Sequence, residues 1–535
     1  MENAHAVEFR GISKRFGDVL ANDKVDLYVD RGMVMSLLGE NGSGKTTLMN
    51  MLAGIYYPDE GEILLDGKAA DIRSPKDAFE HKVGMIHQHF MLVDVFSAAD
   101  NIILGLEEKG RLDKKAVSEK VRLIGRKYGF DIDPEKKIYD MSVSEKQTVE
   151  IIKVLYRGAD ILILDEPTAV LTPQETARLF DIIRAMRDDG KVVIIITHKL
   201  NEVMEISDVV AVMRRGKHIA TVRTSETSEA ELTEMMVGKK VDLDITRTRP
   251  VDPVARLTIA GLTVRDNDGI VRLDKVGFIA YGGEILGIAG IAGSGQKELL
   301  ETIAGLRRAE KGSVIYSPNG RPPEELLGKT PMEIREAGVS LAFVPEDRLG
   351  MGLVGGMGMV ENMMLRSWSK GKGVFVHKEE PRRLAKSVYD FLEVATPDIN
   401  YPVRKLSGGN VQKVLVGREI ASEPSVLMSA YAVRGLDINT SYIIYNLMAG
   451  QKAKGVAVIF VGEDLDVLLE LCDRILVLCG GKVSGIVDAR TTTKEELGLL
   501  MTKVGEHSMF THFDAGAETP AVSADEEADP DWEEK

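Results

Sequence analysis

Cysteine is nearly absent from this chain. Only Cys472 and Cys479 occur among its 535 residues, and two cysteines cannot build a disulfide framework. Their surroundings, LLELCDRILVLCGG, are typical of a helix end that runs into a core strand. We therefore expect buried free thiols, as in proteins of the reducing cytoplasm.

Membrane-spanning and secretory segments are also missing. No apolar run reaches the length of about 20 residues that a membrane-spanning helix needs. The first residues, MENAHAVEFR, do not combine a charged region with a following apolar one, as a secretion signal does. The sequence therefore predicts a chain without a membrane span or an export signal.

Basic clusters are the third absence. No run of Lys and Arg marks a nucleic-acid-binding surface, and the net charge is −15. Residues 514–535 alone hold nine acidic residues and one lysine, which is about half of the negative excess. Their Ala-, Asp-, Glu- and Pro-rich composition predicts a disordered acidic tail over residues 506–535. A solvated tail is the simpler interpretation, and a docking role is the alternative.

What the chain does contain is typical of large soluble domains. Apolar residues make up 44% and charged residues 28%, and the length suffices for two or more domains with large cores. Short apolar runs at 161–166 and 192–196 alternate with helical stretches. This alternation predicts an α/β fold with a parallel sheet.

The stretch GENGSGKT matches the phosphate-loop pattern G-x-x-x-x-G-K-[ST] at every fixed position. It lies between an apolar run at 33–38, expected to be a buried strand, and a helical stretch at 47–53. Glycines let several N–H groups point at phosphates, and the helix start adds positive charge. A lysine here reaches phosphates and a threonine holds Mg²⁺. The predicted nucleotide-binding residues are Gly39, Glu40, Asn41, Gly42, Ser43, Gly44, Lys45, Thr46 and Thr47.

Five further residues fit a nucleotide-hydrolysing site. Phe16 can stack on adenine, and Gln88 can contact Mg²⁺ or the attacking water. Asp165 closes an apolar strand, where a carboxylate orders Mg²⁺, and Glu166 follows it as a general base. His198 ends the next strand and can hold the phosphate and the water. Taken singly, each has a plainer alternative: a loop aromatic, a polar strand end, a surface acidic pair or a structural histidine.

The second half of the chain repeats the first. DKVDLYVDRGMVMSLLGENGSGKT, from Asp23, aligns without gaps with DKVGFIAYGGEILGIAGIAGSGQK, from Asp274. A repeat of this length indicates duplicated domains rather than a solenoid. We expect the first domain at 1–245, a polar linker at 246–256 and the second domain at 257–505.

The repeat has lost its own phosphate chemistry. The first site contains Lys45, Thr46, Gln88, Asp165, Glu166 and His198. We call the positions of the second half that align with the first site the second site. The phosphate lysine and the magnesium hydroxyl are lost from their places, and the residues in place of Asp165 and Glu166 can neither order magnesium nor act as a base. The aligned residues are Asn267 in place of Phe16, Gln296 for Lys45, Lys297 for Thr46, Glu346 for Gln88, Ala430 for Asp165, Tyr431 for Glu166 and Glu463 for His198.

These motifs resemble the nucleotide-binding subunits of ABC transporters. GENGSGKT, Gln88, ILILDEPTAVLTPQE and ITH are similar to that superfamily's Walker motifs, Q-loop, D-loop and switch histidine. The resemblance covers nearly the whole chain except the acidic tail. It implies two tandem P-loop NTPase domains, each with a parallel-sheet core, a helical subdomain and an amino-terminal antiparallel strand region.

The superfamily's signature motif completes the prediction. LSGGNVQK resembles it, and its Ser407, Gly408, Gly409 and Asn410 stand at a helix start whose N–H groups can cap a γ-phosphate. The first half has MSVSEKQTV there, with Ser144 and Glu145 in poor agreement. Family members pack head to tail, so the good Walker motifs of one half face the good signature of the other. Asp437, in GLD, would serve the same site.

Among ABC proteins, the fused arrangement resembles the ATP-binding subunits of nucleoside and monosaccharide importers. HQHFMLVDVFSAADNIILG and FVPEDR are most similar to the nucleoside type, and the ribose/galactose type is the near alternative. The resemblance implies ATP and Mg²⁺, permease subunits, a lipid-anchored or periplasmic solute-binding protein, no nucleic acid, and a place on the cytoplasmic face of the membrane. A soluble twin-cassette ATPase acting on ribosomes or DNA is the remote alternative. Departures from the group occur at Ser144, Glu145, Thr148, Ala432 and Val433.

Overall fold

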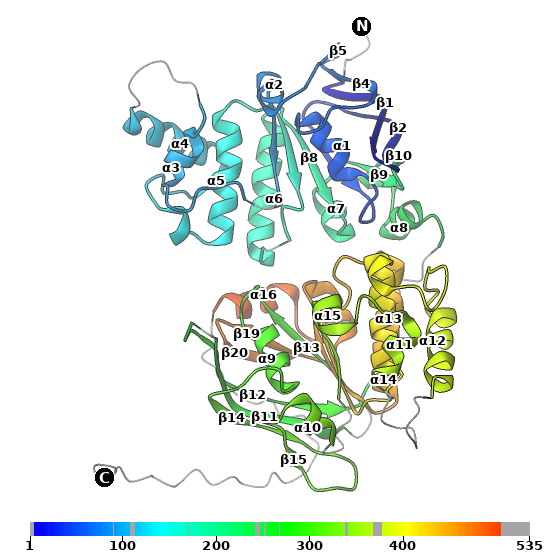
Figure 1. The fold of residues 1–535 in the computed structure, drawn as a ribbon. Helices are drawn as coiled ribbons and strands as arrows, with labels where there is room; N and C mark the ends of the chain where they lie inside the picture. Colours follow the sequence, from blue (N-terminus) through cyan, green and yellow to red (C-terminus); the bar gives the residue numbers. More distant parts are fainter. Residues whose placement is uncertain are drawn as a thin grey trace, which may run out of the picture.

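The computed structural model has two similar halves (Figure 1). It describes residues 5–503 apart from 89, 107–112, 170, 241–244, 246, 251–252, 267, 337–340 and 367–376. The expected tail at 506–535 and the position of Asn267 lie outside the described residues.

The first half contains two sheets. The central sheet has the order β10-β9-β3-β8-β7-β6, with β10 antiparallel and the other strands parallel. An antiparallel sheet, β2-β1-β4-β5, lies beside it. The strands are β1 Val7–Phe16, β2 Val19–Val29, β3 Val34–Leu38, β4 Glu60–Leu65, β5 Lys68–Ala69, β6 Val83–Ile86, β7 Ile161–Asp165, β8 Val192–Thr197, β9 Val209–Arg214 and β10 Lys217–Arg223.

Central strands of this sheet are buried on both faces. In β7, Ile161 and Ile163 enter one apolar core, whereas Leu162 and Leu164 enter the other. A strand with both faces covered is apolar without alternation, which explains the run ILIL. The covering helices are α1 Lys45–Leu52, α2 Pro75–Glu80, α3 Ala98–Ile103, α4 Lys114–Tyr128, α5 Val143–Tyr156, α6 Pro173–Asp188, α7 Leu200–Ile206 and α8 Glu229–Val237.

The second half repeats this architecture. Its sheets have the orders β16-β17-β18-β13-β19-β20 and β12-β11-β14-β15. The strands are β11 Val254–Arg265, β12 Val271–Gly282, β13 Ile285–Gly290, β14 Lys311–Tyr316, β15 Glu324–Glu325, β16 Leu341–Val344, β17 Val426–Ala430, β18 Ala457–Val461, β19 Arg474–Cys479 and β20 Lys482–Asp488. The helices are α9 Gln296–Ile303, α10 Pro331–Glu336, α11 Met359–Met364, α12 Glu379–Phe391, α13 Gly408–Ile420, α14 Ile438–Ala453, α15 Leu465–Leu471 and α16 Lys494–Thr502.

The expected α/β class and its two-sheet halves are therefore confirmed. Strand β11 begins at Val254, inside the expected linker at 246–256. Described linker residues lie against the second half: Arg247 Nη1 donates to the Leu469 carbonyl at 2.5 Å.

Contacts between the halves follow an approximate two-fold axis. Asn201 donates to Asp466, and these residues stand three positions after His198 and Glu463, which are equivalent. Gln174 of α6 donates to the Glu495 carbonyl of α16 at 2.8 Å, and the equivalent helices α14 and α8 also meet. A residue that contacts its own equivalent marks the axis of a self-complementary interface. In Figure 1, α13 accordingly lies on the side of α1 and α8, and α5 on the side of α9.

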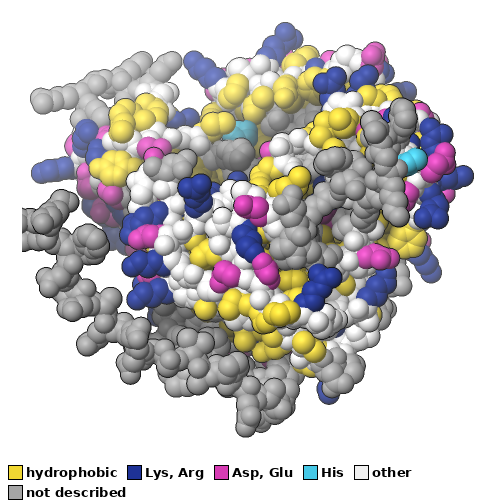
Figure 2. Space-filling view, turned by 60° about the horizontal axis from the view of Figure 1, so that its bottom comes forward, with side chains coloured by type: hydrophobic (Ala, Val, Ile, Leu, Met, Phe, Trp, Pro, Cys, Tyr) yellow, Lys and Arg dark blue, Asp and Glu magenta, His cyan; other side chains and the backbone are white. Residues whose placement is uncertain are grey.

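The outer surface is mixed in character. Figure 2 shows basic and acidic side chains interspersed with apolar ones over the described part of the face it draws. Among the described helices, none is both long and apolar enough to cross a membrane.

The two thiols differ in access, which corrects the expectation that both are buried. Cys472 is fully buried and Cys479 is only partly buried. Burial raises the pKa of the Cys472 thiol far above its ordinary value, and the thiolate is the reactive form. We expect a thiol reagent at pH 8 to modify one cysteine in the native chain and two after denaturation. Rapid modification of Cys472 in the native chain would contradict this.

Candidate functional site

The phosphate loop joins β3 to α1. Its glycines are sterically required, because a Cβ on Gly39 would collide with the Met213 carbonyl and one on Gly44 with the Ala21 carbonyl. Gly44 also has φ of 97°, a left-handed conformation that favours glycine. The Asn22 amide donates to the Gly44 carbonyl at 3.2 Å. The loop is thus fixed by the strands around it.

Lys45 lies inside this loop. Its Nζ donates to the carbonyls of Gly39 at 2.7 Å and Glu40 at 3.0 Å, and the residue is 6% exposed. Burial lowers the pKa of Lys45, while the charges of Glu166 and Asp165 oppose this shift. Ser43 Oγ is buried without a hydrogen-bond partner among the described residues. A buried cation and an unused hydroxyl in one glycine loop suit an anion with several acceptor oxygens.

Asp165 and Thr46 form the candidate magnesium position. Asp165 ends β7, and the nearby Thr46 side chain lowers the pKa of its carboxyl group. Burial and the neighbouring Glu166 charge raise the pKa of Asp165 to about 6, against the opposing effect of Lys45. Two carboxylates with so little cationic compensation would gain from a divalent ion, and a hydroxyl with one carboxylate is a common magnesium donor set beside phosphates.

Glu166 occupies the centre of a three-residue network. Its carboxylate accepts from the Gln88 amide at 3.2 Å and contacts His198 Nδ1 at 2.9 Å. The hydrogen bond to His198 lowers the pKa of Glu166 despite its burial, so the carboxylate is ionised at neutral pH. The backbone of Glu166 has φ of 47°, and its N–H donates to the Ile196 carbonyl at 2.9 Å. Strained backbone of this kind often accompanies functional sites.

Phe16 is the last residue of β1, and its ring is available for stacking. The residue is 43% exposed, and the ring packs edge-on against Tyr56, with 5.1 Å between centroids. Lys14 Nζ lies 5.7 Å from the ring centroid. The ring is thus partly exposed, with Tyr56 packed edge-on and Lys14 over the ring.

Residues of the second half meet the first site. Burial and the charge of Asp437 raise the pKa of Glu40 in the phosphate loop. Asp437 caps α14 by accepting from Thr440 N at 2.8 Å, and a Cβ on Gly409 would lie 3.7 Å from its carboxylate. Ser407 caps α13, and its Oγ accepts from the Asn410 amide at 2.8 Å. The start of α13, Asp437 and the phosphate loop therefore lie in one region.

The equivalent helix start in the first half is already capped by its own side chain. Glu145 accepts from the Ser142 N–H at 2.7 Å, and Ser142 Oγ accepts from the Glu145 N–H at 3.2 Å. Lys136 adds an ion pair with Glu145 at 2.6 Å. A carboxylate thus occupies the end of α5 that a phosphate would need.

The second site holds an ion network of its own. Gln296, in the place of Lys45, is buried and donates to the Ile291 carbonyl at 3.2 Å. Arg434 pairs with Glu346 at 2.7 Å and with Glu463 at 3.3 Å, the residues in the Gln88 and His198 positions. Tyr431 keeps the left-handed backbone of Glu166, with φ of 51°. The local fold has survived while the chemistry has changed.

Sequence reasoning missed Arg434 and Arg348. Arg348 donates to the carbonyls of Gly408, at 3.2 Å, and Arg434. The stretch FVPEDR contains Arg348, but the sequence analysis gave a site position only to its Glu346. The available signal was that Arg348, a charged residue, lies two positions after Glu346, which aligns with Gln88.

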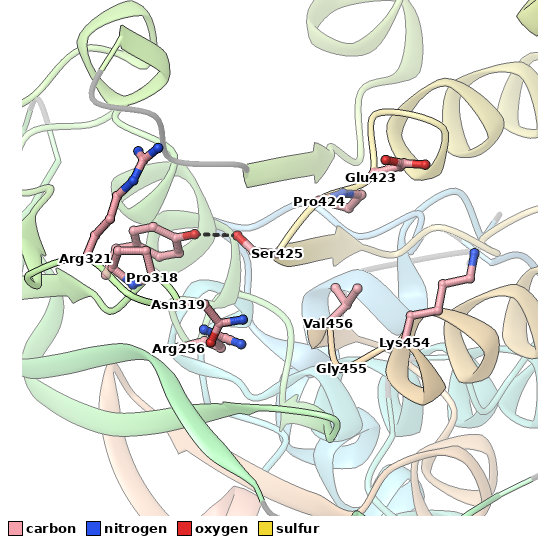
Figure 3. Close-up of a pocket in the computed structure, with 11 residues that line it drawn as sticks. Arg256, Pro318, Asn319, Arg321, Glu423, Pro424, Ser425, Lys454, Gly455 and Val456 are labelled. Carbon is pink, nitrogen blue, oxygen red and sulfur yellow. Dashed lines mark hydrogen bonds between the residues drawn. The ribbon is translucent and has the colours of Figure 1, made fainter.

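A cavity of about 370 Å³ lies elsewhere in the second half. Figure 3 shows its lining, with the Tyr316 hydroxyl bonded to Ser425. It includes the loops that precede β17 and β18, whereas the phosphate loops follow the carboxyl end of a strand. The cavity therefore lies at the opposite sheet edge and contains none of the predicted site residues.

Comparison with known proteins follows the same division into halves. The family described as "ABC transporter" matches residues 22–169 and 273–429. The guanosine import ATP-binding protein of Bacillus subtilis is 43% identical, with 93% of this chain and 97% of that protein covered. The nucleoside import ATP-binding protein of Lactococcus lactis is 40% identical, with 94% and 99% covered. The ribose import ATP-binding protein of Rubrobacter xylanophilus is 37% identical, with 94% and 98% covered.

Proposed function

The chain belongs to the ABC transporter family of ATP-binding proteins, and we propose that it is the ATP-hydrolysing subunit of an importer for nucleosides. Two of the relatives described above, at 43% and 40% identity, are named for guanosine and nucleoside import. The observation that carries the enzymatic part is the network of Gln88, Glu166 and His198 beside the phosphate loop.

In this proposal a single composite site hydrolyses ATP. Lys45 and the N–H groups of 39–47 hold the phosphates, Phe16 stacks on the base, and Ser407, Gly408, Gly409, Asn410 and Asp437 close the site from the second half. Magnesium would be held by Thr46, Asp165 and Gln88, whose oxygen donors fit that ion. When bound, it would neutralise charge on the phosphates.

Glu166 would then act as the general base. Its ionised carboxylate accepts a proton from the attacking water, and its contacts to Gln88 and His198 hold its two oxygens in fixed directions. His198 is near enough to orient the same water and the γ-phosphate. The start of α13 would offer the N–H groups of Ser407, Gly408 and Gly409, for which the described residues give no acceptor, to the charge that develops on the phosphoryl oxygens.

The proposed partners are integral-membrane permease subunits and a lipid-anchored or periplasmic solute-binding protein. The chain would work at the cytoplasmic face, moving the permease by closing and opening its two halves. A monosaccharide such as ribose or galactose is the second candidate solute, because the ribose import relative covers 94% of this chain at 37% identity.

Purification of the tagged chain from its own membranes in mild detergent tests the proposal. We expect permeases and a solute-binding protein to co-purify, and the complex in lipid to hydrolyse ATP faster with nucleosides than with ribose or galactose. Stimulation by the sugars alone would select the second candidate. Co-purification with ribosomal or DNA-bound factors would overturn the transport proposal.

Substitution of the one lysine in each phosphate loop tests the one-site arrangement. Lys45→Ala removes the loop's cation, so we expect the ATPase rate to fall by about 10²-fold or more. Lys297→Ala, in the second site, should leave the rate within about twofold, because its Nζ only approaches Glu301 at 3.9 Å. Steady-state phosphate release measures both. A large loss in the Lys297 variant would show that the second site also hydrolyses ATP.

A further inference from the structure

Arg348 joins two separate segments of the second half. It follows β16 and begins a short helical turn, where the Asp347 carboxylate accepts from the Gly350 N–H at 2.8 Å. Its Nη1 donates to the Gly408 carbonyl at 3.2 Å, and its Nη2 donates to the Arg434 carbonyl. Gly408 is the first residue of α13, and Arg434 stands three residues before Asp437. One side chain therefore connects the signature motif to the segment that carries Asp437.

A guanidinium group suits this bridge. Its planar fork presents several donors in fixed directions, and it stays charged in proteins. Burial and the nearby Arg434 charge lower the pKa of Arg348, but not into a range where the group loses its proton. Space is limited, because a Cβ on Gly408 would lie 3.1 Å from Nη1. The bridge thus combines two charge-assisted hydrogen bonds with close packing.

The first half has no such bridge at the equivalent position. Gln88 aligns with Glu346, and Val93 aligns with Val354, because their N–H groups donate to the equivalent Asn101 and Asn362. The second half therefore has three extra residues in the segment that contains Arg348, and residues 90–93 of the first half are all apolar. The helix start there is instead capped by Glu145. The arginine therefore accompanies the signature motif that keeps its glycines, and this sorting indicates a role at the first site rather than a general structural role.

We propose that Arg348 is a positioning residue for ATP hydrolysis at the first site. It holds the start of α13 and the Arg434–Asp437 segment as one unit, so that the N–H groups of Ser407–Gly409 and the Asp437 carboxylate approach the phosphate loop together. Arg348 itself touches neither the phosphate loop nor Glu166 in the described contacts. This role rests on the proposed function.

Substitution of Arg348 by Met, which keeps the length but removes the donors, provides the test. ATP binds first to the phosphate loop of the first half, so we expect KM to change by less than about threefold. Since the signature groups act on the closed, reacting state, kcat should fall by about tenfold or more. Arg348→Lys should recover part of kcat, because one ammonium group can serve one carbonyl but not the forked pair.

The control is Arg383→Met, an exposed arginine on α12 for which the described residues give no ion pair. It should keep kcat within about twofold, and thermal unfolding should show all variants folded. In a double variant with Ser407→Ala, the effect of Arg348→Met on kcat should shrink, because both act through α13.

The outcomes separate the inference from the proposed function. Full kcat in Arg348→Met, or a loss that simply multiplies with that of Ser407→Ala, would overturn the positioning role. A rise in KM with unchanged kcat would overturn it as well, since it would indicate ground-state binding. Absence of ATPase activity in the unmodified complex would instead contradict the proposed function itself.

Discussion

Glu166→Gln is expected to bind ATP and to hydrolyse it at least about 10²-fold more slowly than the unmodified chain. The amide keeps the shape of the side chain and can still contact His198, so the site should remain assembled. It cannot accept a proton from water, which the ionised carboxylate can. In the proposed cycle, ATP binding closes the two halves and hydrolysis reopens them, so this variant should accumulate as a closed, ATP-bound complex. Single-turnover hydrolysis and retention of labelled ATP on gel filtration measure both effects.

The matched control for this variant is Tyr431→Phe. Tyr431 occupies the Glu166 position of the second half with the same left-handed backbone and the same type of hydrogen bond, from its N–H to the Val461 carbonyl at 3.0 Å. Loss of its hydroxyl should leave hydrolysis unchanged. If Glu166→Gln kept most of the rate, Glu166 would not be the base, and a second acceptor for the proton would be required.

Most of the fold could be predicted because the buried strands have a strong local signal. The runs at 33–38, 161–166 and 192–196 were predicted as strands, and the structure has β3, β7 and β8 there. Strand β7 ends at Asp165, as expected, but the left-handed backbone of Glu166 was not predicted. No propensity of a glutamate favours that conformation, which the surrounding sheet imposes.

The site was predictable where motifs are contiguous in sequence and obscure where they are not. The residues from Gly39 to Thr46 can be recognised as a phosphate loop from their spacing alone. Arg348 does not, because its acceptors are backbone carbonyls 60 and 86 positions away, and any residue can supply a carbonyl. The pairing of Arg434 with Glu346 and Glu463 was hidden for the same reason, because Arg434 and Glu346 lie 88 positions apart in the sequence. Such contacts depend on topology, not on local pattern.

The capping of α5 predicts how the first site can be switched off. In the first half, the pattern S-x-x-E lets the Glu145 carboxylate accept from the Ser142 N–H. In the second half, Asn410 stands three positions after Ser407, in the place of Glu145. Asn410→Glu would create the same pattern at the start of α13. Its carboxylate would occupy the N–H groups that the phosphate requires and would repel the phosphate's charge. We expect hydrolysis to fall by about 10²-fold to 10³-fold, the effect of losing an oxyanion donor.

The reciprocal variant separates this explanation from a loss of stability. Glu145→Asn removes the self-capping carboxylate from the first half, where no competent phosphate loop faces it, so hydrolysis should stay within about twofold. Asn410→Gln adds the same length without charge. Its amide oxygen can still accept from the Ser407 N–H, as in a capping box, but it does not repel the phosphate, so it should lose less than Asn410→Glu. Phosphate release and thermal unfolding of the three variants give the comparison. Equal losses in Asn410→Gln and Asn410→Glu would mean that side-chain size or neutral capping, not an anion at the helix start, closes the site. A gain of activity in Glu145→Asn would mean that the second site needs only its signature restored, and that Gln296 and Tyr431 do not exclude turnover.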